Sequence, residues 1–435
     1  MTRSIYLSPM SGESPCSSLQ PPSLHDRLAQ VSSEDSTLHA WAHLPNSVEP
    51  GAPAPAAPRA LEGMPFGVKD VLDVLGMPTR CGSDHVDDTP AARDAGCVAL
   101  LREAGAVPLG KTHTAEFAYR RPPLTRNPVA PGHTPGGSSS GSAAAVAAQM
   151  VPFALSTQTG GSIIRPAAYC GTVGFKPSFG AVARSGLGPG CESLDTIGWH
   201  AADLNTAHRV ACVLLDNEPR FQTVKPRSVE GLRVLHISAP GEELPEAEVA
   251  DNLGRACEAL GARGAVLLRQ RPQHSSRLDR LLAAHKIVMH YELSRSLRPI
   301  VLRHPAVSAP VQQLLQTGRS ISRSDYTEAL AFQARERLSW EAFTEGADII
   351  LSPSAPTAAG VGLENSGSSA YCRAWTFLGW PCLHVPIGNT GAGLPLGFQI
   401  ITPWQRDFDA FEAAEAIYRV CGGKDTRPLS DNDHD

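Results

Sequence analysis

A long segment with almost no charge, residues 127–180, places the strongest constraint on how this chain can fold. Its 54 residues contain no Asp or Glu and only two strongly charged side chains, Arg165 and Lys176. Charged residues make up 19% of the whole sequence, so about ten would be expected in a segment of this length. Because charged side chains normally cover protein surfaces, the segment must be mostly buried or must line a site with its main chain.

Two turns rich in glycine and serine lie inside this segment, at residues 136–142 and 157–162. A helix-compatible run of small residues and an apolar run separate them. This arrangement can bring two hydroxyl groups together with a row of main-chain N–H groups. Such groups bind an oxyanion without a charged side chain. The segment therefore predicts an oxyanion-binding site rather than a pair of flexible linkers.

The composition excludes several classes of protein. The 38 Lys and Arg residues face 43 Asp and Glu residues, so no broad basic surface for nucleic acid or an anionic membrane is expected. The ten cysteines are scattered without a CxxC pair, which is typical of reduced thiols. The N-terminus lacks the apolar stretch of a signal peptide, and no run of 18 apolar residues occurs. We expect a soluble, cytoplasmic protein.

Segments with strand and helix patterns alternate from Gly63 onward. Strands that alternate with helices favour an α/β fold with a sheet covered on both faces. The expected strands are 64–75, 106–109, 232–237, 265–268 and 348–351, and the expected helices are 94–104, 142–150, 245–260, 278–295 and 325–344.

Two matches to catalytic motifs do not fit their surroundings. Residues 105–112 match the phosphate-binding pattern GxxxxGK[ST], which needs a strand before its first glycine and a helix after its lysine. Here a helix pattern precedes the match, so a helix-to-strand turn is predicted instead. Residues 137–141 match the nucleophile pattern GxSxG, but no apolar strand precedes them as that motif requires.

A serine nucleophile needs a base, and the uncharged segment offers little choice. Its only histidine is His133, and a Ser-His-Asp triad would need partners from elsewhere in the chain. Lys69 is the other option because it lies in a strand-like apolar run, where burial would disfavour its ammonium form. From the local sequence alone, a salt bridge or a lysine that reaches solvent explains this residue equally well.

The chain resembles the amidase signature hydrolases. The matching motifs are PFGVKD at 65–70, GKTHTAEF at 110–117, GGSSSGSAAAVAA from 136, TGGS at 159–162 and GFKP at 174–177. The resemblance resumes with DIILSPSAP at 348–356, GWP at 379–381 and GLPLGFQ at 393–399. It implies an α/β fold in which a large mixed β-sheet is sandwiched between helices.

The resemblance also implies a Ser-cisSer-Lys triad. Ser162 matches the nucleophile, Ser138 matches the serine that follows a cis peptide bond, and Lys69 matches the base. In the implied mechanism uncharged Lys69 takes a proton through Ser138, Ser162 attacks the amide carbonyl, and water hydrolyses the acyl-enzyme. The implied oxyanion hole is formed by the main chain of Thr159, Gly160, Gly161 and Ser162. No metal ion and no organic cofactor is implied.

Two positions depart from the common form of the family's motif. Gln158 stands where the family often has Asp, and Arg165 lies one position later than the usual arginine. These changes alter the polar network behind the nucleophile. Arg165 can orient the nucleophile loop or contact a carboxylate of the substrate, and structural hydrogen bonding is the favoured role.

Other reactive residue types have simpler explanations. Cys170 lies eight residues after Ser162 in an apolar stretch and is interpreted as a buried structural cysteine. His285, His290 and Glu292 share a long helix pattern and either line the substrate pocket or face solvent.

Composition and resemblance together divide the chain into three parts. Residues 1–60 hold nine Pro and eleven Ser, show a helix pattern only around 24–44, and are expected to form a loosely attached arm and linker. Residues 61–425 are expected to form the amidase signature catalytic domain, in which the divergent region at about 190–345 forms the substrate pocket. Residues 426–435 are expected to be a polar tail.

Three functions are compatible with the resemblance. The first is an amidohydrolase that cleaves a linear carboxamide C–N bond and releases ammonia or an amine. The second is the A subunit of a glutamine-dependent tRNA amidotransferase, which the shifted Arg165 and Gln158 fit less well, and the third is a catalytically silent binding scaffold. The expected partner is a small-molecule amide, without direct contact to nucleic acid or membrane, and a homodimer or a small accessory subunit stays open.

Overall fold

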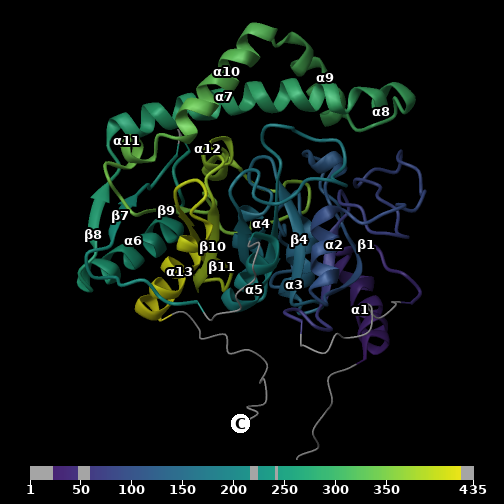
Figure 1. The fold of residues 1–435 in the computed structure, drawn as a ribbon, viewed down its shortest axis with the longest axis horizontal. Helices are drawn as coiled ribbons and strands as arrows, with labels where there is room; N and C mark the ends of the chain where they lie inside the picture. The colour runs from purple at the N-terminus through teal and green to yellow at the C-terminus, as the bar shows by residue number, and fades with distance from the viewer. Residues whose placement is uncertain (1–22, 48–58, 216–223, 241–242, 423–435) are drawn as a thin grey trace, which may run out of the picture.

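The computed structural model describes residues 23–47, 59–215, 224–240 and 243–422. The strands in these residues are β1 (Trp41–His43), β2 (Pro65–Lys69), β3 (Val107–Thr112), β4 (Phe153–Gln158), β5 (Val173–Lys176), β6 (Thr196–Ala201), β7 (Arg233–His236), β8 (Val266–Arg269), β9 (Ile349–Pro353), β10 (Cys382–Asn389) and β11 (Pro395–Ile401). They form one sheet in the order β1-β3-β2-β4-β6-β5-β10-β11-β9-β7-β8 (Figure 1).

The sheet is mixed. β2 runs parallel to β3 and β4, and β7 runs parallel to β8 and β9. The other neighbouring strands are antiparallel. β2 and β4, whose C-terminal ends carry Lys69 and Gln158, are neighbours in the centre of one half of the sheet, so these ends lie close together.

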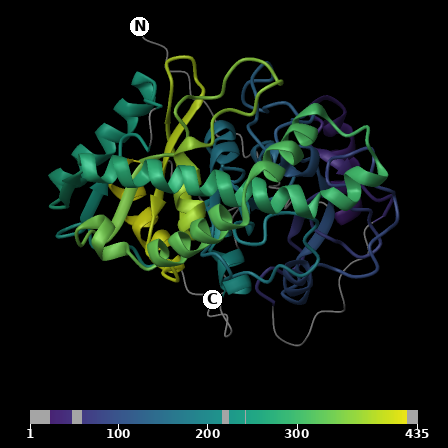
Figure 2. The same ribbon diagram turned by 90° about the horizontal axis from the view of Figure 1, so that it is seen from above.

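Helices surround this sheet. They are α1 (Leu24–Leu38), α2 (Gly96–Glu103), the short 3-10 helix η1 (Glu116–Ala118), α3 (Ser140–Ala147), α4 (Ile164–Cys170), α5 (Leu204–Leu215), α6 (Ala247–Ala262), α7 (Pro272–Ser296), α8 (Arg298–Arg303), α9 (Ala309–Ser320), α10 (Arg323–Arg337), α11 (Trp340–Thr344), α12 (Ala370–Leu378) and α13 (Asp407–Cys421). Helices α7 to α10 lie across one end of the strands, at the top of Figure 1, and Figure 2 shows them from above. Of the helices in the described residues, none combines the length and apolar character that crossing a membrane requires.

Two neighbouring residues of β5 show that helices cover both faces of the sheet. A Cβ atom added to Gly174 would lie only 2.5 Å from the Cβ atom of Ala167 on α4. The next residue, Phe175, points to the opposite face, because side chains alternate along a strand. There its ring centre lies 4.7 Å from that of Phe411 on α13. A mixed sheet sandwiched between helices confirms the predicted fold class.

The predicted helix-to-strand turn at residues 105–112 is confirmed. α2 ends at Glu103, and β3 contains the glycine and lysine of the apparent phosphate-binding motif. The helix expected at 325–344 differs from the structure, which divides it into α10 and α11 around Leu338 and Ser339.

The predicted arm of residues 1–60 differs from the structure in its described part. α1 buries Leu28, Val31 and Leu38, and β1 pairs with β3 in the sheet. These side chains pack with Trp41 and Met150 in one apolar cluster, so this part is firmly attached to the domain. The attachment arises because the apolar positions fall on one face of the helix.

The proline-rich residues 48–58 and the tail at 426–435 lie outside the described residues, and the boundaries at 61 and 425 stay a prediction.

A buried ion pair fixes the loop that follows β2. Lys111 Nζ on β3 lies 3.2 Å from Asp70 Oδ1, and both side chains are almost fully buried. The carboxylate of Asp70 also accepts hydrogen bonds from the main-chain N–H groups of Arg80 and Gly82. The pair therefore joins β3, the end of β2 and the loop at residues 80–82.

We expect Asp70→Ala to lower the free energy of unfolding by about 3–5 kcal/mol, because it leaves Lys111 buried without its partner. Urea denaturation measures this change. The double variant Asp70→Ala/Lys111→Met removes both charges and should recover most of the loss. An unchanged unfolding midpoint in the single variant would show that the pair contributes nothing.

Candidate active site

Lys69 occupies the last position of β2 and is fully buried. Its Nζ atom donates hydrogen bonds of 2.8 Å to Ser138 Oγ and of 2.8 Å to Thr157 Oγ1. Thr157 lies on β4, which pairs with β2, so the parallel strands bring these two side chains together. In the described residues no carboxylate lies within 4.0 Å of the amine, so Lys69 has hydroxyl partners rather than a salt bridge.

Burial lowers the pKa of Lys69 from 10.5 to about 7, and the more distant Asp195 carboxyl offsets only part of this effect. The lowering arises because the ammonium ion loses its hydration inside the protein. A substantial fraction of this lysine is consequently uncharged near neutral pH. An uncharged amine has a lone pair that can accept the proton of the Ser138 hydroxyl across the same 2.8 Å.

Ser138 lies in the loop before α3, and the peptide bond between Gly137 and Ser138 is cis. The carbonyl of Gly137 accepts a short hydrogen bond from Nη2 of Arg165 on α4. Arg165 therefore links the loop that carries Ser138 to the helix that follows Ser162. This is the structural hydrogen bond that the sequence favoured for Arg165.

Ser162 lies in the turn between β4 and α4, and the side chain of Gln158 shapes this turn from behind. Its Oε1 atom accepts hydrogen bonds from the main-chain N–H groups of Ile163 at 2.8 Å and Ile164 at 3.1 Å. Its Nε2 atom donates to Thr376 Oγ1 at 3.0 Å. The uncharged amide can do both tasks at once, whereas a carboxylate could only accept.

The turn leaves several main-chain donors available. Within the described part of the chain, no hydrogen bond uses the N–H groups of Gly160, Gly161 or Ser162. The carbonyl of Gly160 accepts a hydrogen bond of 2.8 Å from Thr376 Oγ1, which fixes the orientation of the turn. Such N–H groups can stabilise a negative charge that develops on an oxygen atom.

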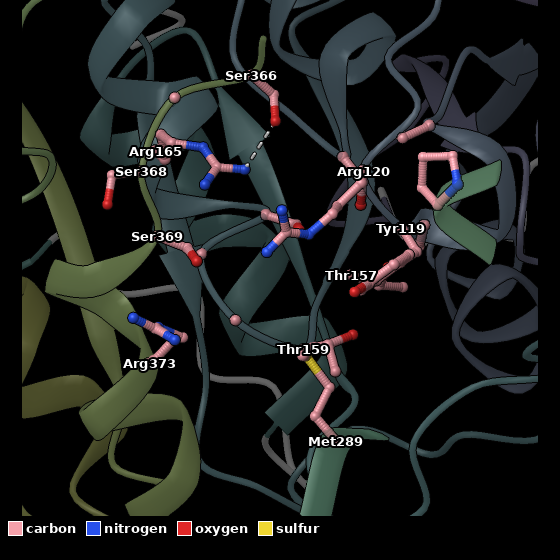
Figure 3. Close-up of a pocket in the computed structure, with 18 of the residues that line it drawn as sticks. Tyr119, Arg120, Thr157, Thr159, Arg165, Met289, Ser366, Ser368, Ser369 and Arg373 are labelled. Atoms are coloured by element: carbon pink, nitrogen blue, oxygen red, sulfur yellow. Dashed lines mark hydrogen bonds between the residues drawn. The ribbon is translucent and has the colours of Figure 1, made fainter. Parts of the chain in front are cut away.

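Ser138, Ser162 and the turn that carries Ser162 line one cavity of about 880 Å³ (Figure 3). Most of the lining residues fall within 115–120, 157–169, 187–195, 285–293 and 356–373, and the others are Val71, Thr134, Ser138, Glu243 and Pro310. The predicted pocket region at 190–345 contributes to this lining, but the loops near 120 and 360 contribute as well. The structure thus brings Ser138, Ser162, Thr159, Gly160 and Gly161 to one cavity, with Lys69 directly behind Ser138.

Two polar residues near the site had no clear signal in the sequence. Thr157 contacts Lys69, and Asp195 accepts a hydrogen bond of 2.5 Å from Thr159 Oγ1. Burial raises the pKa of Asp195. The position of Thr157, five residues before Ser162 in the same motif, is the only sequence signal that could have indicated one of them.

The remaining candidates fall into two groups. His285 and His290 line the cavity, and His285 Nε2 lies 2.8 Å from the carbonyl oxygen of Thr159. Glu292 instead accepts hydrogen bonds from Ser193 and Tyr326 outside the cavity.

The thiol of Cys170 is buried, and burial raises its pKa. A thiol of this kind stays protonated, as expected for a structural cysteine.

Comparisons with known proteins identify the family. The Amidase family profile matches residues 32–409. The chain is 32% identical over 407 residues to the A subunit of glutamyl-tRNA(Gln) amidotransferase from Akkermansia muciniphila, covering 80% of this chain and 84% of that protein. It is 48% identical over 168 residues to Amidase 1 of Arabidopsis thaliana, covering 37% of this chain and 40% of that protein.

A solved structure described as an amidase superposes with a TM-score of 0.77 at 26% identity, covering 92% of this chain and 96% of that one. The family match spans most of the chain, including every strand that lines the site. The chain therefore belongs to the amidase family, the amidase signature enzymes that hydrolyse C–N bonds of amides.

Proposed function

We propose that this protein hydrolyses a linear, non-peptide carboxamide and releases ammonia or an amine, with Lys69 as base, Ser138 as proton relay and Ser162 as nucleophile. The observation that most supports this function is the buried amine of Lys69, which has a pKa of about 7 and lies 2.8 Å from Ser138 Oγ. A lysine with this pKa can exchange protons near neutral pH. Ser162 shares a cavity with Ser138. Among the described residues no hydrogen bond joins their two hydroxyl groups, so the proposed relay requires this contact to form when the substrate binds.

In the proposed acylation step, Ser162 Oγ attacks the carbonyl carbon of the amide and gives its proton to Ser138, which gives its own to the uncharged Lys69. The carbonyl oxygen becomes an oxyanion, which main-chain N–H groups of the turn formed by Thr159, Gly160, Gly161 and Ser162 stabilise. The proton then returns through Ser138 to the nitrogen of the leaving group. The C–N bond breaks, the amine departs, and the acyl group stays on Ser162 as an ester.

In the proposed deacylation step, water takes the place of the amine. Ser138 and Lys69 accept a proton from water, which attacks the ester carbonyl, and the relay returns that proton to Ser162 Oγ. The products are a carboxylic acid and ammonia or an amine. Atoms balance with water as the only co-reactant, and no cofactor takes part in these steps.

This mechanism predicts a rise of activity with pH. Because the uncharged form of Lys69 is the base and its pKa is about 7, roughly one tenth of the protein is competent at pH 6 and roughly nine tenths at pH 8. A plot of log kcat/KM against pH should rise with unit slope and level off above pH 7. A profile that falls through this range would contradict the role of Lys69.

A direct test of the proposed function is an ammonia assay with a panel of amides. The panel contains aliphatic amides, aryl amides and carbamoyl compounds such as allophanate and biuret. Amidase 1 of Arabidopsis thaliana, the relative with 48% identity over 168 residues, supports amide hydrolysis by its name. Absence of ammonia release from all of these compounds would count against the proposal.

A second candidate is the A subunit of a tRNA-dependent amidotransferase, which the relative from Akkermansia muciniphila supports by its name. In that case glutamine would be the ammonia donor and partner subunits would be required. Hydrolysis of glutamine that depends on copurified partners and on a charged tRNA would favour this candidate. Hydrolysis of amides by the isolated chain favours the first.

A further inference from the structure

Three guanidinium groups reach the cavity from three separate parts of the chain. Arg120 follows η1, Arg165 lies on α4 and Arg373 lies on α12 (Figure 3). The figure shows Arg120 reaching into the cavity from the side opposite Arg165 and Arg373. The cavity thus has a strongly cationic wall near the turn that carries Ser162.

The roles of these arginines differ. Arg165 donates hydrogen bonds to the carbonyl of Gly137 and to Ser366 Oγ, so it already has acceptors. Among the described residues, neither the exposed Arg120 nor the partly buried Arg373 donates a side-chain hydrogen bond, and no carboxylate lies within 4.0 Å of either guanidinium. The Nε atoms of Arg373 and Arg165 are both buried without a hydrogen-bond partner among the described residues.

The charges around Arg373 leave an excess of positive charge. Burial lowers the pKa of Arg373, and the positive charges of Arg120 and Arg165 contribute to this lowering, while Glu243 raises it. The Glu243 carboxylate accepts a hydrogen bond of 2.5 Å from Ser368 Oγ and so is already engaged. Asp195 and Glu364 also line the cavity, and Asp195 is bound to Thr159. Arg373 is only partly buried, but its unbonded Nε atom is shielded from solvent, and a bound anion would supply the acceptor that this atom lacks.

The side chain of Arg373 lies beside the turn that carries Ser162. A Cβ atom added to Gly160, two residues before Ser162, would lie 3.6 Å from Cγ of Arg373. The arginine stem therefore packs beside the turn that holds the predicted oxyanion donors. An anion bound to its guanidinium would lie near the turn that carries Ser162.

The main chain around Arg120 is held in an unusual conformation. Phe117, Ala118 and Arg120 all have positive φ angles, of 48°, 55° and 48°. Such angles in residues other than glycine are strained and persist where the surrounding structure fixes them. Here the N–H of Phe117 donates to the carbonyl of Cys81 at 2.8 Å. This conformation carries Arg120 to the cavity rather than away from it.

We propose that Arg120 and Arg373 together bind a carboxylate of the substrate, so that the substrate is a short acid with a carboxamide at its other end. This inference rests on the proposed amide hydrolysis. A carboxylate offers two acceptor oxygens for guanidinium donors. A neutral amide of the same size would leave the buried Nε donor of Arg373 without an acceptor.

The test compares amides that differ only in charge: succinamate with succinamide, and glutaramate with glutaramide. The unchanged protein should have a kcat/KM about 10- to 100-fold higher for each acidic amide, the range expected for charge-assisted hydrogen bonds. Arg373→Gln and Arg120→Gln should remove this preference, mainly through a higher KM, and Arg373→Lys should restore part of it. The kcat/KM for the neutral amides should fall much less than the kcat/KM for the acidic amides.

Arg121→Gln is the matched control. Arg121 is the next arginine along the chain, is about half exposed, lies 3.9 Å from Glu116 and is not part of the cavity wall. The variant should keep the preference for acidic amides. Equal kcat/KM values for acidic and neutral amides in the unchanged protein would overturn the proposal. So would an equal loss for both kinds of substrate in Arg373→Gln, which would indicate a structural role.

A binding measurement separates this inference from the proposed function. Titration calorimetry with succinate and glutarate on Ser162→Ala protein reports on the arginines without hydrolysis. Binding that Arg373→Gln abolishes would support the carboxylate site even if no amide in the panel is cleaved. Failure of both diacids to bind would overturn it even if neutral amides are cleaved.

Discussion

Ser162→Ala protein should lose hydrolysis of every amide that the unchanged protein cleaves, by about 10⁴-fold or more. The reason is that no acyl-enzyme can form without the hydroxyl. Folding should be unaffected, because Ser162 Oγ makes no hydrogen bond with another described residue. Steady-state kinetics with ammonia detection and a thermal unfolding curve together measure this outcome.

Ser352→Ala is a suitable control for this variant. Ser352 is a buried serine on β9 that does not line the cavity, and among the described residues its hydroxyl makes one long hydrogen bond of 3.5 Å, to the carbonyl of Pro353. The change removes a buried hydroxyl without touching the proposed relay, so the variant should keep normal activity. Substantial amide hydrolysis by Ser162→Ala protein would defeat the assignment of the nucleophile.

Lys69→Met should lower kcat by about 10²–10⁴-fold, the usual contribution of a positioned acid or base. Methionine fills most of the buried space of the lysine stem but cannot take a proton. The rise of kcat/KM through pH 7 should vanish with the lysine, because Lys69 is the group whose pKa is lowered to about 7. The pH profile of the residual activity tests this point.

A second buried lysine provides the control for this variant. Lys176 at the end of β5 is fully buried and donates to the carbonyl groups of Pro177 and Trp380, away from the cavity. Lys176→Met should lower stability but keep the pH profile of the folded protein. In the double variant Lys69→Met/Ser162→Ala, the losses should not add, because the residues act as one unit. Additive losses would mean that the two side chains act separately.

Much of the local structure could be predicted from the sequence. The expected strand at 232–237 and helix at 245–260 match β7 and α6 to within two residues. Their apolar periodicity is set by neighbours a few positions apart, so the pattern is visible in the chain itself. The helix pattern near 24–44 is visible in the same way, but the firm attachment of α1 is not, because its partners on β3 and α3 are far away in sequence.

The sequence predicted some residues of the candidate site and missed others. The glycine and serine turns indicated two hydroxyl-bearing segments, and the apolar run around Lys69 made it a candidate base. The resemblance then singled out Ser138 and Ser162 and assigned the role of Lys69. The partner Thr157 and the cavity arginines Arg120 and Arg373 carried no such signal. A single arginine in a loop or helix looks like any surface arginine until the fold determines what surrounds it.

The sequence by itself determined the family, the mixed α/β architecture and the candidates for relay and nucleophile, because these depend on motifs and periodicities within short stretches. The tertiary structure decided how far the pKa of Lys69 is lowered, since that depends on burial by segments far away in the chain. It also placed the Ser138 and Thr157 hydroxyl groups beside the amine. The fold also brings Arg120 and Arg373 to the wall of one cavity. Charge and solvation act through space, so they are fixed only when distant segments come together.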